Sequence, residues 1–268
     1  MISGLRRRWL ISALVTLSVL VAGSVAWGKS ITGTKRADKL TGTARADVIR
    51  GGRGNDRISG KRGNDRLNGQ AGNDVLRGDA GADRLNGRAG RDRVNGGAGA
   101  DTVTGSTGRD RLRGNSGNDR LVAGPGDDRL NSDSGDDILL GGAGNDSLAA
   151  GPGDDRMEGG AGNDRLFAGL PGPGSGSDSL FGGAGNDRLR GDRGVDRVEG
   201  GDGDDDITGG AGEDDLIGGP GNDTIDARDD AEDTIDCGDG EDTVILDVQE
   251  DGVDDCENQR LPPEPPEA

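Results

Sequence analysis

The feature that most constrains the fold of this chain is a period of nine residues. An aspartate recurs at this spacing along most of the sequence, and a hydrophobic residue stands two positions after each of the 23 aspartates. The stretch 159–167, GGAGNDRLF, shows the unit: glycines that allow a tight turn, one aspartate, and three residues with an aliphatic centre. The pattern therefore predicts a turn followed by a short strand, repeated many times.

The repeat aspartates form two alternating series. The first row is Asp38, Asp56, Asp74, Asp92, Asp110, Asp128, Asp146, Asp164, Asp187, Asp205, Asp223 and Asp242. The second row is Asp47, Asp65, Asp83, Asp101, Asp119, Asp137, Asp155, Asp178, Asp196, Asp214 and Asp233.

The repeat resembles the hemolysin-type calcium-binding repeat, or RTX nonapeptide, of consensus GGxGxDxUx, in which U is a large aliphatic residue. The resemblance covers residues 31–246. It implies an all-β fold, a right-handed parallel β-roll or β-helix solenoid, with six residues in each turn segment and three in each strand. Two copies complete one turn of the roll, so each row of aspartates lies along one edge. About eleven turns at roughly 4.8 Å give a rod near 55 Å long.

The resemblance also implies calcium between successive turns, because a hard cation prefers six or more oxygen ligands and the aspartates and turn carbonyls supply them. The copies with the fullest consensus all lie in the first row, and weaker sites are expected in the second row. We expect the strongest sites at Asp146, Asp164, Asp187, Asp205 and Asp223. The metal ligands expected in this way are Asp56, Asp74, Asp146, Asp155, Asp164, Asp178, Asp187, Asp196, Asp205, Asp214, Asp223 and Asp242. The first two copies carry Arg36 and Arg45 in place of the last turn glycine, which is typical of a cap, and calcium binding is doubtful at 228–232, where the glycines are lost.

Composition supports a fold that depends on a ligand. With 55 glycines in 268 residues and only 1 % aromatic residues, the chain cannot build an ordinary hydrophobic core. Ordering so many glycine-rich residues is costly in conformational entropy, so we expect a ligand that binds only the folded form to complete the stability, and Ca²⁺ is the natural candidate.

Charge is distributed unevenly along the chain. Residues 31–120 carry 19 Lys/Arg and 11 Asp, whereas residues 121–268 carry 9 Arg and 40 Asp/Glu. We expect the acidic half to repel itself unless it binds counter-ions, and its charge and lack of aromatic residues argue against nucleic acid as a partner. Arg follows the aspartate in 11 of the 23 copies. The favoured interpretation is an exposed ladder; the alternative is that Arg pairs with the aspartates where calcium is absent, mainly in the first half.

The N-terminus predicts export. Residues 1–28 combine Arg6, Arg7 and Arg8 with an apolar run and a small-residue site at Ser24–Ala26, the pattern of a secretory signal peptide. An uncleaved membrane anchor is the alternative. We expect an extracellular, secreted protein with no membrane span after processing.

The C-terminal part contains the two cysteines, Cys237 and Cys256, which behind a signal peptide most simply form one disulfide; two free thiols or a soft metal site are the alternatives. Residues 247–268 read as a closing segment followed by a disordered tail rich in Pro and Glu. The five-residue insertion at 170–174 should be a surface loop.

No catalytic residue is expected. The chain has no histidine or tyrosine, and acid pairs such as Asp127–Asp128 recur as part of the turn. The favoured function is a secreted, non-enzymatic calcium-binding solenoid with a structural or adhesive role and contacts to a cell surface or extracellular matrix. The alternatives are an ice- or polysaccharide-binding solenoid and a disordered acidic calcium buffer.

Overall fold

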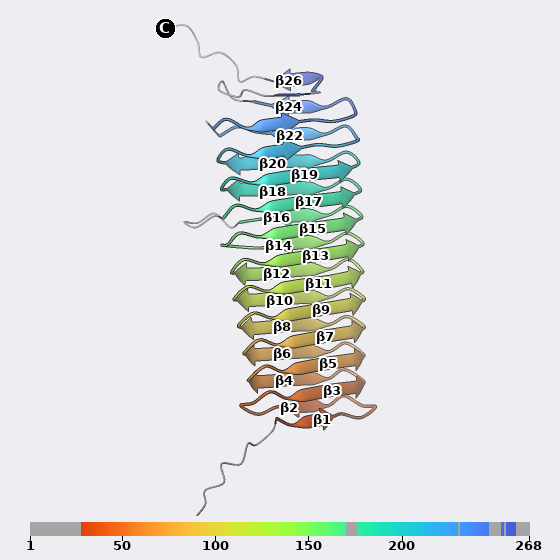
Figure 1. Cartoon of the computed structure of the whole chain (residues 1–268). Coiled ribbons are helices and arrows are strands. Elements are labelled where there is room, and N and C mark those ends of the chain that lie inside the picture. Colours follow the sequence, from red (N-terminus) through yellow and green to blue (C-terminus); the bar gives the residue numbers. More distant parts are fainter. Residues whose placement is uncertain (1–27, 170–175, 230, 247–252, 255, 261–268) are drawn as a thin grey trace, which may run out of the picture.

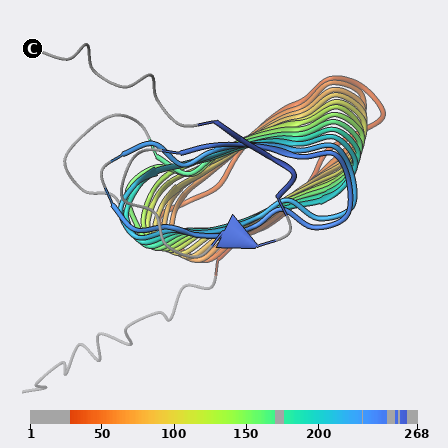
Figure 2. The same ribbon diagram turned by 90° about the horizontal axis from the view of Figure 1, so that it is seen from above.

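The chain folds as a rod of parallel strands stacked in two sheets (Figure 1). The computed structural model describes residues 28–169, 176–229, 231–246, 253–254 and 256–260. Strands alternate between two 13-stranded sheets, so that each strand pairs with the strands two places before and after it. Seen along the axis, the turns superpose as a flattened loop with a sheet on each long side (Figure 2). The all-β parallel solenoid is therefore confirmed.

The bounds of the strands follow the repeat. One sheet holds β1 (Ser30–Thr32), β3 (Val48–Arg53), β5 (Arg66–Ala71), β7 (Arg84–Ala89), β9 (Thr102–Thr107), β11 (Arg120–Pro125), β13 (Ile138–Ala143), β15 (Arg156–Ala161), β17 (Ser179–Ala184), β19 (Arg197–Asp202), β21 (Asp215–Ile217), β23 (Thr234–Asp236) and β25 (Val253–Asp254). The other holds β2 (Lys39–Thr41), β4 (Arg57–Arg62), β6 (Val75–Ala80), β8 (Arg93–Ala98), β10 (Arg111–Ser116), β12 (Arg129–Ser134), β14 (Ser147–Ala149), β16 (Arg165–Phe167), β18 (Arg188–Arg193), β20 (Asp206–Ala211), β22 (Thr224–Asp226), β24 (Thr243–Ile245) and β26 (Asn258–Arg260).

The hydrophobic core is a double column of the aliphatic residues that follow the aspartates. In β10, Leu112 pairs in register with Val94 of β8 and Leu130 of β12, so equivalent residues stack directly on one another. Because successive strand residues point to opposite faces, the aliphatic side chain points inward and its two neighbours outward. From Ile49 to Val244 these central side chains are at most 2 % exposed. The core column predicted from the sequence is confirmed.

Most strands are longer than the three residues that the resemblance implies. Among the described residues, sixteen of the 26 strands have six residues, because pairing continues past the aliphatic triplet into the turn. In β3, for example, Gly52 at φ +116° still pairs with Gln70 of β5. The chain therefore bends within a paired segment at this left-handed residue, without leaving the sheet. Eight non-glycine residues take the same bend, at φ between 70° and 93°: Lys61, Gln70, Asp79, Arg88, Ser106, Asn115, Asp133 and Asp192.

The C-terminal segment extends the stack. Strands β25 and β26 pair with β23 and β24, so the solenoid continues past the last nonapeptide copy. Cys237 and Cys256 form a disulfide, with Cα atoms 5.2 Å apart, which links this last turn to the one before. Residues 1–27 of the signal peptide predicted at 1–28, the insertion at 170–174 and the tail at 261–268 lie outside the described residues. Within the described part of the chain, no helix is long and apolar enough to cross a membrane.

Candidate metal centre

The repeat aspartates form two buried rows, one along each edge of the rod. Apart from Asp38 at the first turn, every repeat aspartate is at most 3 % exposed. Each follows its turn and precedes a strand, so the turn folds over the carboxylate while the aliphatic residue two positions later fills the core. Burying that many carboxyl groups is costly unless each finds a partner.

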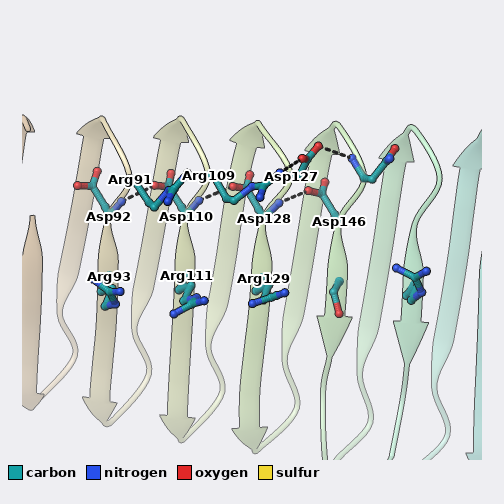
Figure 3. A pocket seen from close by; sticks show the side chains of 13 residues that line it. Arg91, Asp92, Arg93, Arg109, Asp110, Arg111, Asp127, Asp128, Arg129 and Asp146 are labelled. Carbon is teal, nitrogen blue, oxygen red and sulfur yellow. Dashed lines mark hydrogen bonds and ion pairs between the residues drawn. The ribbon is translucent and has the colours of Figure 1, made fainter. Parts of the chain in front are cut away.

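One carboxylate oxygen of each aspartate has a backbone partner. The Oδ1 atom accepts a hydrogen bond from the N–H of the aspartate one turn earlier, as in Asp146 N to Asp164 Oδ1 at 2.7 Å. The same bond recurs at 2.6–2.9 Å from Asp38 to Asp242 in the first row, and three successive bonds of that row appear in Figure 3. The second row repeats it from Asp47 to Asp233. These bonds fix every carboxyl group in one orientation.

The other oxygen of most repeat aspartates has no hydrogen-bond partner. Buried Oδ2 atoms without one belong to Asp56, Asp65, Asp74, Asp83, Asp92, Asp101, Asp110, Asp119, Asp128, Asp137, Asp146, Asp155, Asp164, Asp187, Asp196, Asp205, Asp214, Asp223 and Asp242. Leaving a buried polar atom unsatisfied costs about 1–3 kcal/mol, and more for a charged one. So many at equivalent positions indicate a missing partner of one kind.

Most of these oxygens face a space left by a glycine. In each copy, we call the residue that lies four places after the repeat aspartate of the previous copy the first-position residue. A Cβ atom added to the first-position residue Gly159 would stand 2.5 Å from Asp164 Oδ2 and 2.7 Å from the carbonyl oxygen of Gly182, the equivalent glycine one turn later. Gly159 is not in the left-handed region. Glycine is therefore needed here for space, and that space brings a carboxylate oxygen and a carbonyl oxygen together.

Some copies fill this space with a side chain. The first-position residue is Ala123, Ser132, Ala150, Ala168, Ala227 or Cys237 in the copies of Asp128, Asp137, Asp155, Asp178, Asp233 and Asp242. All six side chains are buried. The sequence prediction overlooked the first-position residues. Glycine recurs at this position although no positive φ is required there, and that recurrence could have identified them.

Burial changes the acidity of the rows. Burial and, to a lesser degree, the neighbouring carboxylates together raise the pKa of Asp155 to about 8 and those of Asp146, Asp205 and Asp214 to about 7. The backbone N–H bond to Oδ1 acts in the opposite direction and is outweighed. Near neutral pH the rows therefore hold protons or must be neutralised by another cation.

The available ligand atoms suit calcium better than a softer metal. In the described residues, no three Asp, Glu, His or Cys side chains come together as a cluster that could hold a metal ion. A cation between turns would thus combine aspartate Oδ2 atoms with backbone carbonyls such as that of Gly182, and water would complete the shell. An oxygen-only, flexible donor set of this kind is what Ca²⁺ takes. The residues present therefore fit the ion that the repeat implies.

The structure places the sequence-predicted ligands as follows. Eleven of the twelve have the unpartnered, buried Oδ2 atom. The twelfth, Asp178, is buried and accepts the Asp155 N–H through Oδ1 at 2.8 Å. Residues of both rows share this geometry, and the difference in strength expected between the rows stays a prediction.

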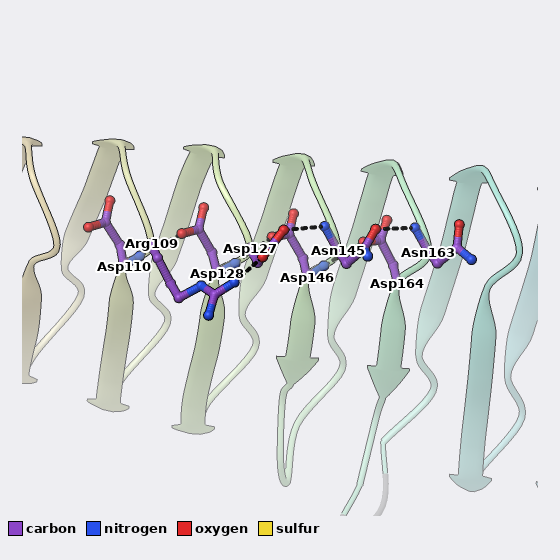
Figure 4. Close-up of polar contacts among 8 residues, drawn as sticks. All are labelled: Arg109, Asp110, Asp127, Asp128, Asn145, Asp146, Asn163 and Asp164. Carbon is purple, nitrogen blue, oxygen red and sulfur yellow. Dashed lines mark hydrogen bonds and ion pairs between the residues drawn. The ribbon is translucent and has the colours of Figure 1, made fainter.

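The arginines lie outside these rows. Arginines after the repeat aspartates, such as Arg93 and Arg165, are exposed, in agreement with an outward ladder. The ion pairs of the described residues join arginines to surface acids, as in Arg109 with Asp127, and not to the buried rows (Figure 4). The alternative that arginine neutralises the repeat aspartates in the first half is therefore wrong for this part of the chain.

A second, exposed ladder runs along the turn tips. The residue before each aspartate is often Asn or Asp, and its side-chain oxygen accepts the backbone N–H of its equivalent one turn later. Asn163 N donates to Asn145 Oδ1 at 2.9 Å in this way (Figure 4). These bonds fix the spacing of successive turns above the buried carboxylates.

Together these features define a β-solenoid of nonapeptide repeats whose edges carry buried oxygen ligands for a hard cation. The family model of the RTX calcium-binding nonapeptide repeat matches residues 32–67, 68–103, 104–139, 140–170, 174–207, 191–225 and 208–244. The chain therefore belongs to the RTX calcium-binding nonapeptide repeat family. No curated protein matches it.

Proposed function

We propose that this chain is a secreted, non-enzymatic calcium-binding solenoid with a structural or adhesive role, and that calcium bound between turns drives its folding. The observation that carries the proposal is the two rows of buried, unpartnered Oδ2 atoms, many of which share a glycine-lined space with a carbonyl oxygen of the next turn. A divalent cation would satisfy these oxygens and remove the repulsion between neighbouring carboxylates.

We further propose that the first-position residue decides which copies bind calcium tightly. Copies with glycine there keep the space beside Oδ2, and they include those of Asp146, Asp164, Asp187, Asp205 and Asp223. Among the ligands predicted from the sequence, Asp155, Asp178 and Asp242 stand beside Ala150, Ala168 and Cys237. We expect these three to contribute weaker sites.

The test fills two open sites. The variant Gly182→Ala/Gly200→Ala places a Cβ atom beside Asp187 Oδ2 and Asp205 Oδ2, without requiring a positive φ from alanine. We expect about two fewer calcium ions bound per chain in isothermal titration calorimetry, and a higher calcium midpoint for folding by circular dichroism. At calcium concentrations about 100 times Kd, each lost site removes about 2.7 kcal/mol of stabilisation.

The matched control opens the same space elsewhere. In Ala123→Gly/Ala150→Gly, the copies of Asp128 and Asp155 gain the glycine that the others have. We expect this variant to bind at least as many calcium ions as the natural chain. Unchanged stoichiometry in the first variant, with the chain folded, would refute the assignment of the sites.

The extracellular location and the lack of enzymatic activity belong to the same proposal. A signal peptide at 1–28 would deliver the chain unfolded to a compartment where calcium is abundant. In the described residues, the buried carboxyl groups belong to a repeating structural array and to no single cleft. An adhesive role would use the exposed columns of the sheets for contacts to a cell surface or matrix.

A further inference from the structure

The exterior of the first five turns is almost purely cationic. Residues 31–120 contain 19 Lys/Arg, no Glu and 11 Asp, and nine of these aspartates are buried repeat residues. Only Asp38 and Asp79 remain as even partly exposed acids in this half. The net charge of the sequence therefore understates the positive charge that this surface presents to a partner.

These cations have few partners within the chain. In the described residues, ion pairs from this half are formed only by Arg109 with Asp127 and by Arg113 with Asp133, both using acids beyond residue 120. The second half differs, since Arg156, Arg188, Arg190, Arg197 and Arg228 each pair with a nearby carboxylate. Apart from Arg109 and Arg113, the described arginines of the first half thus have no ion pair with an acid.

Three arginines, two from the first half and Arg129 just beyond it, form a column. Arg93, Arg111 and Arg129 pair in register on the adjacent strands β8, β10 and β12, and all three are exposed. None of the three is within ion-pair distance of a carboxylate of the described residues. Like charges directly opposite on neighbouring strands destabilise a sheet. Anionic groups from outside that lie against the column would relieve this repulsion.

The column separates two grooves. A groove of about 490 Å³ follows the edge of the rod and is lined by Arg91 and Arg109 from the turns in addition to the column (Figure 3). Aspartates also line this groove: Asp92, Asp110, Asp127, Asp128 and Asp146. A second groove, of about 540 Å³, lies on the sheet face and adds Arg77 and Arg113 to the same three arginines. A ligand lying along either groove meets one arginine of the column per turn, at roughly 4.8 Å intervals.

We propose that this arginine column is a binding site for a linear acidic polysaccharide that lies parallel to the axis of the rod. Guanidinium groups bind sulfate and carboxylate through paired hydrogen bonds, and a straight, periodic column matches a chain with repeating charges. The site goes beyond the proposed calcium role, and requires only that the solenoid be folded.

Two other partners fit less well. No aromatic side chain lines either groove, so a nucleic acid would find no surface on which to stack its bases. A second copy of this chain would offer its acidic half, but several of the surface carboxylates there already pair with that half's own arginines. Both remain outcomes that the test can return.

The test measures binding of heparin fragments to the full mature chain, with calcium in excess and folding verified by circular dichroism. The variant Arg93→Gln/Arg111→Gln/Arg129→Gln removes the column. The control Arg156→Gln/Arg188→Gln/Arg197→Gln removes the same charge from paired arginines. We expect the column variant to raise Kd at least tenfold and to reduce the slope of log Kd against log salt by about 2–3, and the control to change Kd less than twofold.

Several results would overturn the proposal. Equal losses in the two variants would mean that heparin senses only net charge, and neutral dextran binding as tightly as heparin would exclude charge recognition. Tighter binding of a single-stranded oligonucleotide of equal charge would point to nucleic acid. Dimers in sedimentation that the column variant abolishes would point to a second copy. Folding is followed separately, so the two proposals can fail independently. If the chain folds with calcium but does not bind heparin, the calcium proposal still stands. If the chain binds heparin but folds without calcium, the polysaccharide proposal stands and the calcium proposal fails.

Discussion

Without calcium, the folded solenoid is expected to persist at pH 5 and to be lost as the pH rises to 8.5. In the folded chain the pKa values of Asp128 and Asp187 are raised to about 6, those of Asp146 and Asp205 to about 7, and that of Asp155 to about 8. In the unfolded chain an aspartate titrates near 3.9. The folded state therefore binds more protons, so its stability is full below about pH 4 and falls as the pH rises through these folded pKa values.

The size of this effect should be large. A raised pKa costs about 1.4 kcal/mol per unit once the group ionises. The rows contain many such groups, whereas an ordinary domain has only about 5–15 kcal/mol of stability in total. Calcium should restore the fold at pH 8.5 and release protons as it binds, since it replaces them on the same carboxylates.

The measurement is circular dichroism of the calcium-depleted mature chain at pH 5, 7 and 8.5 in constant salt, followed by calcium addition at each pH. Glu213→Gln/Glu241→Gln serves as control, because these exposed acids contribute to net charge but not to the buried rows. It should leave the pH profile nearly unchanged. A calcium-free fold that is equally or more stable at pH 8.5 than at pH 5 would contradict the ionisation account.

Replacing Asp164 and Asp187 by asparagine is expected to have opposite effects with and without calcium. Asparagine keeps an oxygen to accept the backbone N–H one turn earlier, as Asp164 Oδ1 does at 2.7 Å. Its amide can donate to the carbonyl that Oδ2 now faces, so a buried charge becomes a satisfied amide. At pH 8 the calcium-free chain should gain about 1–3 kcal/mol per site. In calcium, the same variant loses two ligands and should need several-fold more calcium to fold.

The comparison is Asp83→Asn/Asp101→Asn in the second row. These aspartates are equally buried, but they lie in the net-positive half, where the chain has no excess of negative charge that a bound cation would relieve. The rise in calcium midpoint should be smaller than for Asp164→Asn/Asp187→Asn. Calcium titrations by circular dichroism, with urea unfolding of the calcium-free proteins, measure both quantities. Equal midpoints, or a larger rise for the second-row variant, would show that calcium is distributed along the rod differently.

The period of nine was enough to predict the path of the chain. With an aspartate every nine residues and an aliphatic residue two places later, only the stacked arrangement buries residues such as Leu112 and Leu130 in one column. Cys237 and Cys256 could be paired because two cysteines leave a single intramolecular choice.

Other features depended on contacts between turns, which a linear pattern does not show. Pairing through Gly52 and Gln70 lengthens the strands because the turn backbones are themselves within hydrogen-bonding distance. Residues 253–254 and 258–260 pair as strands and extend the rod, although no nonapeptide repeat predicts strands there. The space beside Asp164 Oδ2 arises between Gly159 and Gly182, residues of two different turns. Sequence alone identified the acidic ligand and missed the carbonyl that faces it.

The most direct measurement is the location of calcium in crystals of the calcium-loaded mature chain by anomalous scattering. The account predicts ions between turns, 2.3–2.6 Å from the Oδ2 atoms of copies with a first-position glycine, such as those of Asp164, Asp187 and Asp205. It predicts weaker or no density beside Ala123 and Ala150. Ions found only on exposed acids at the turn tips, with the buried Oδ2 atoms of the two rows still without a metal partner, would contradict it.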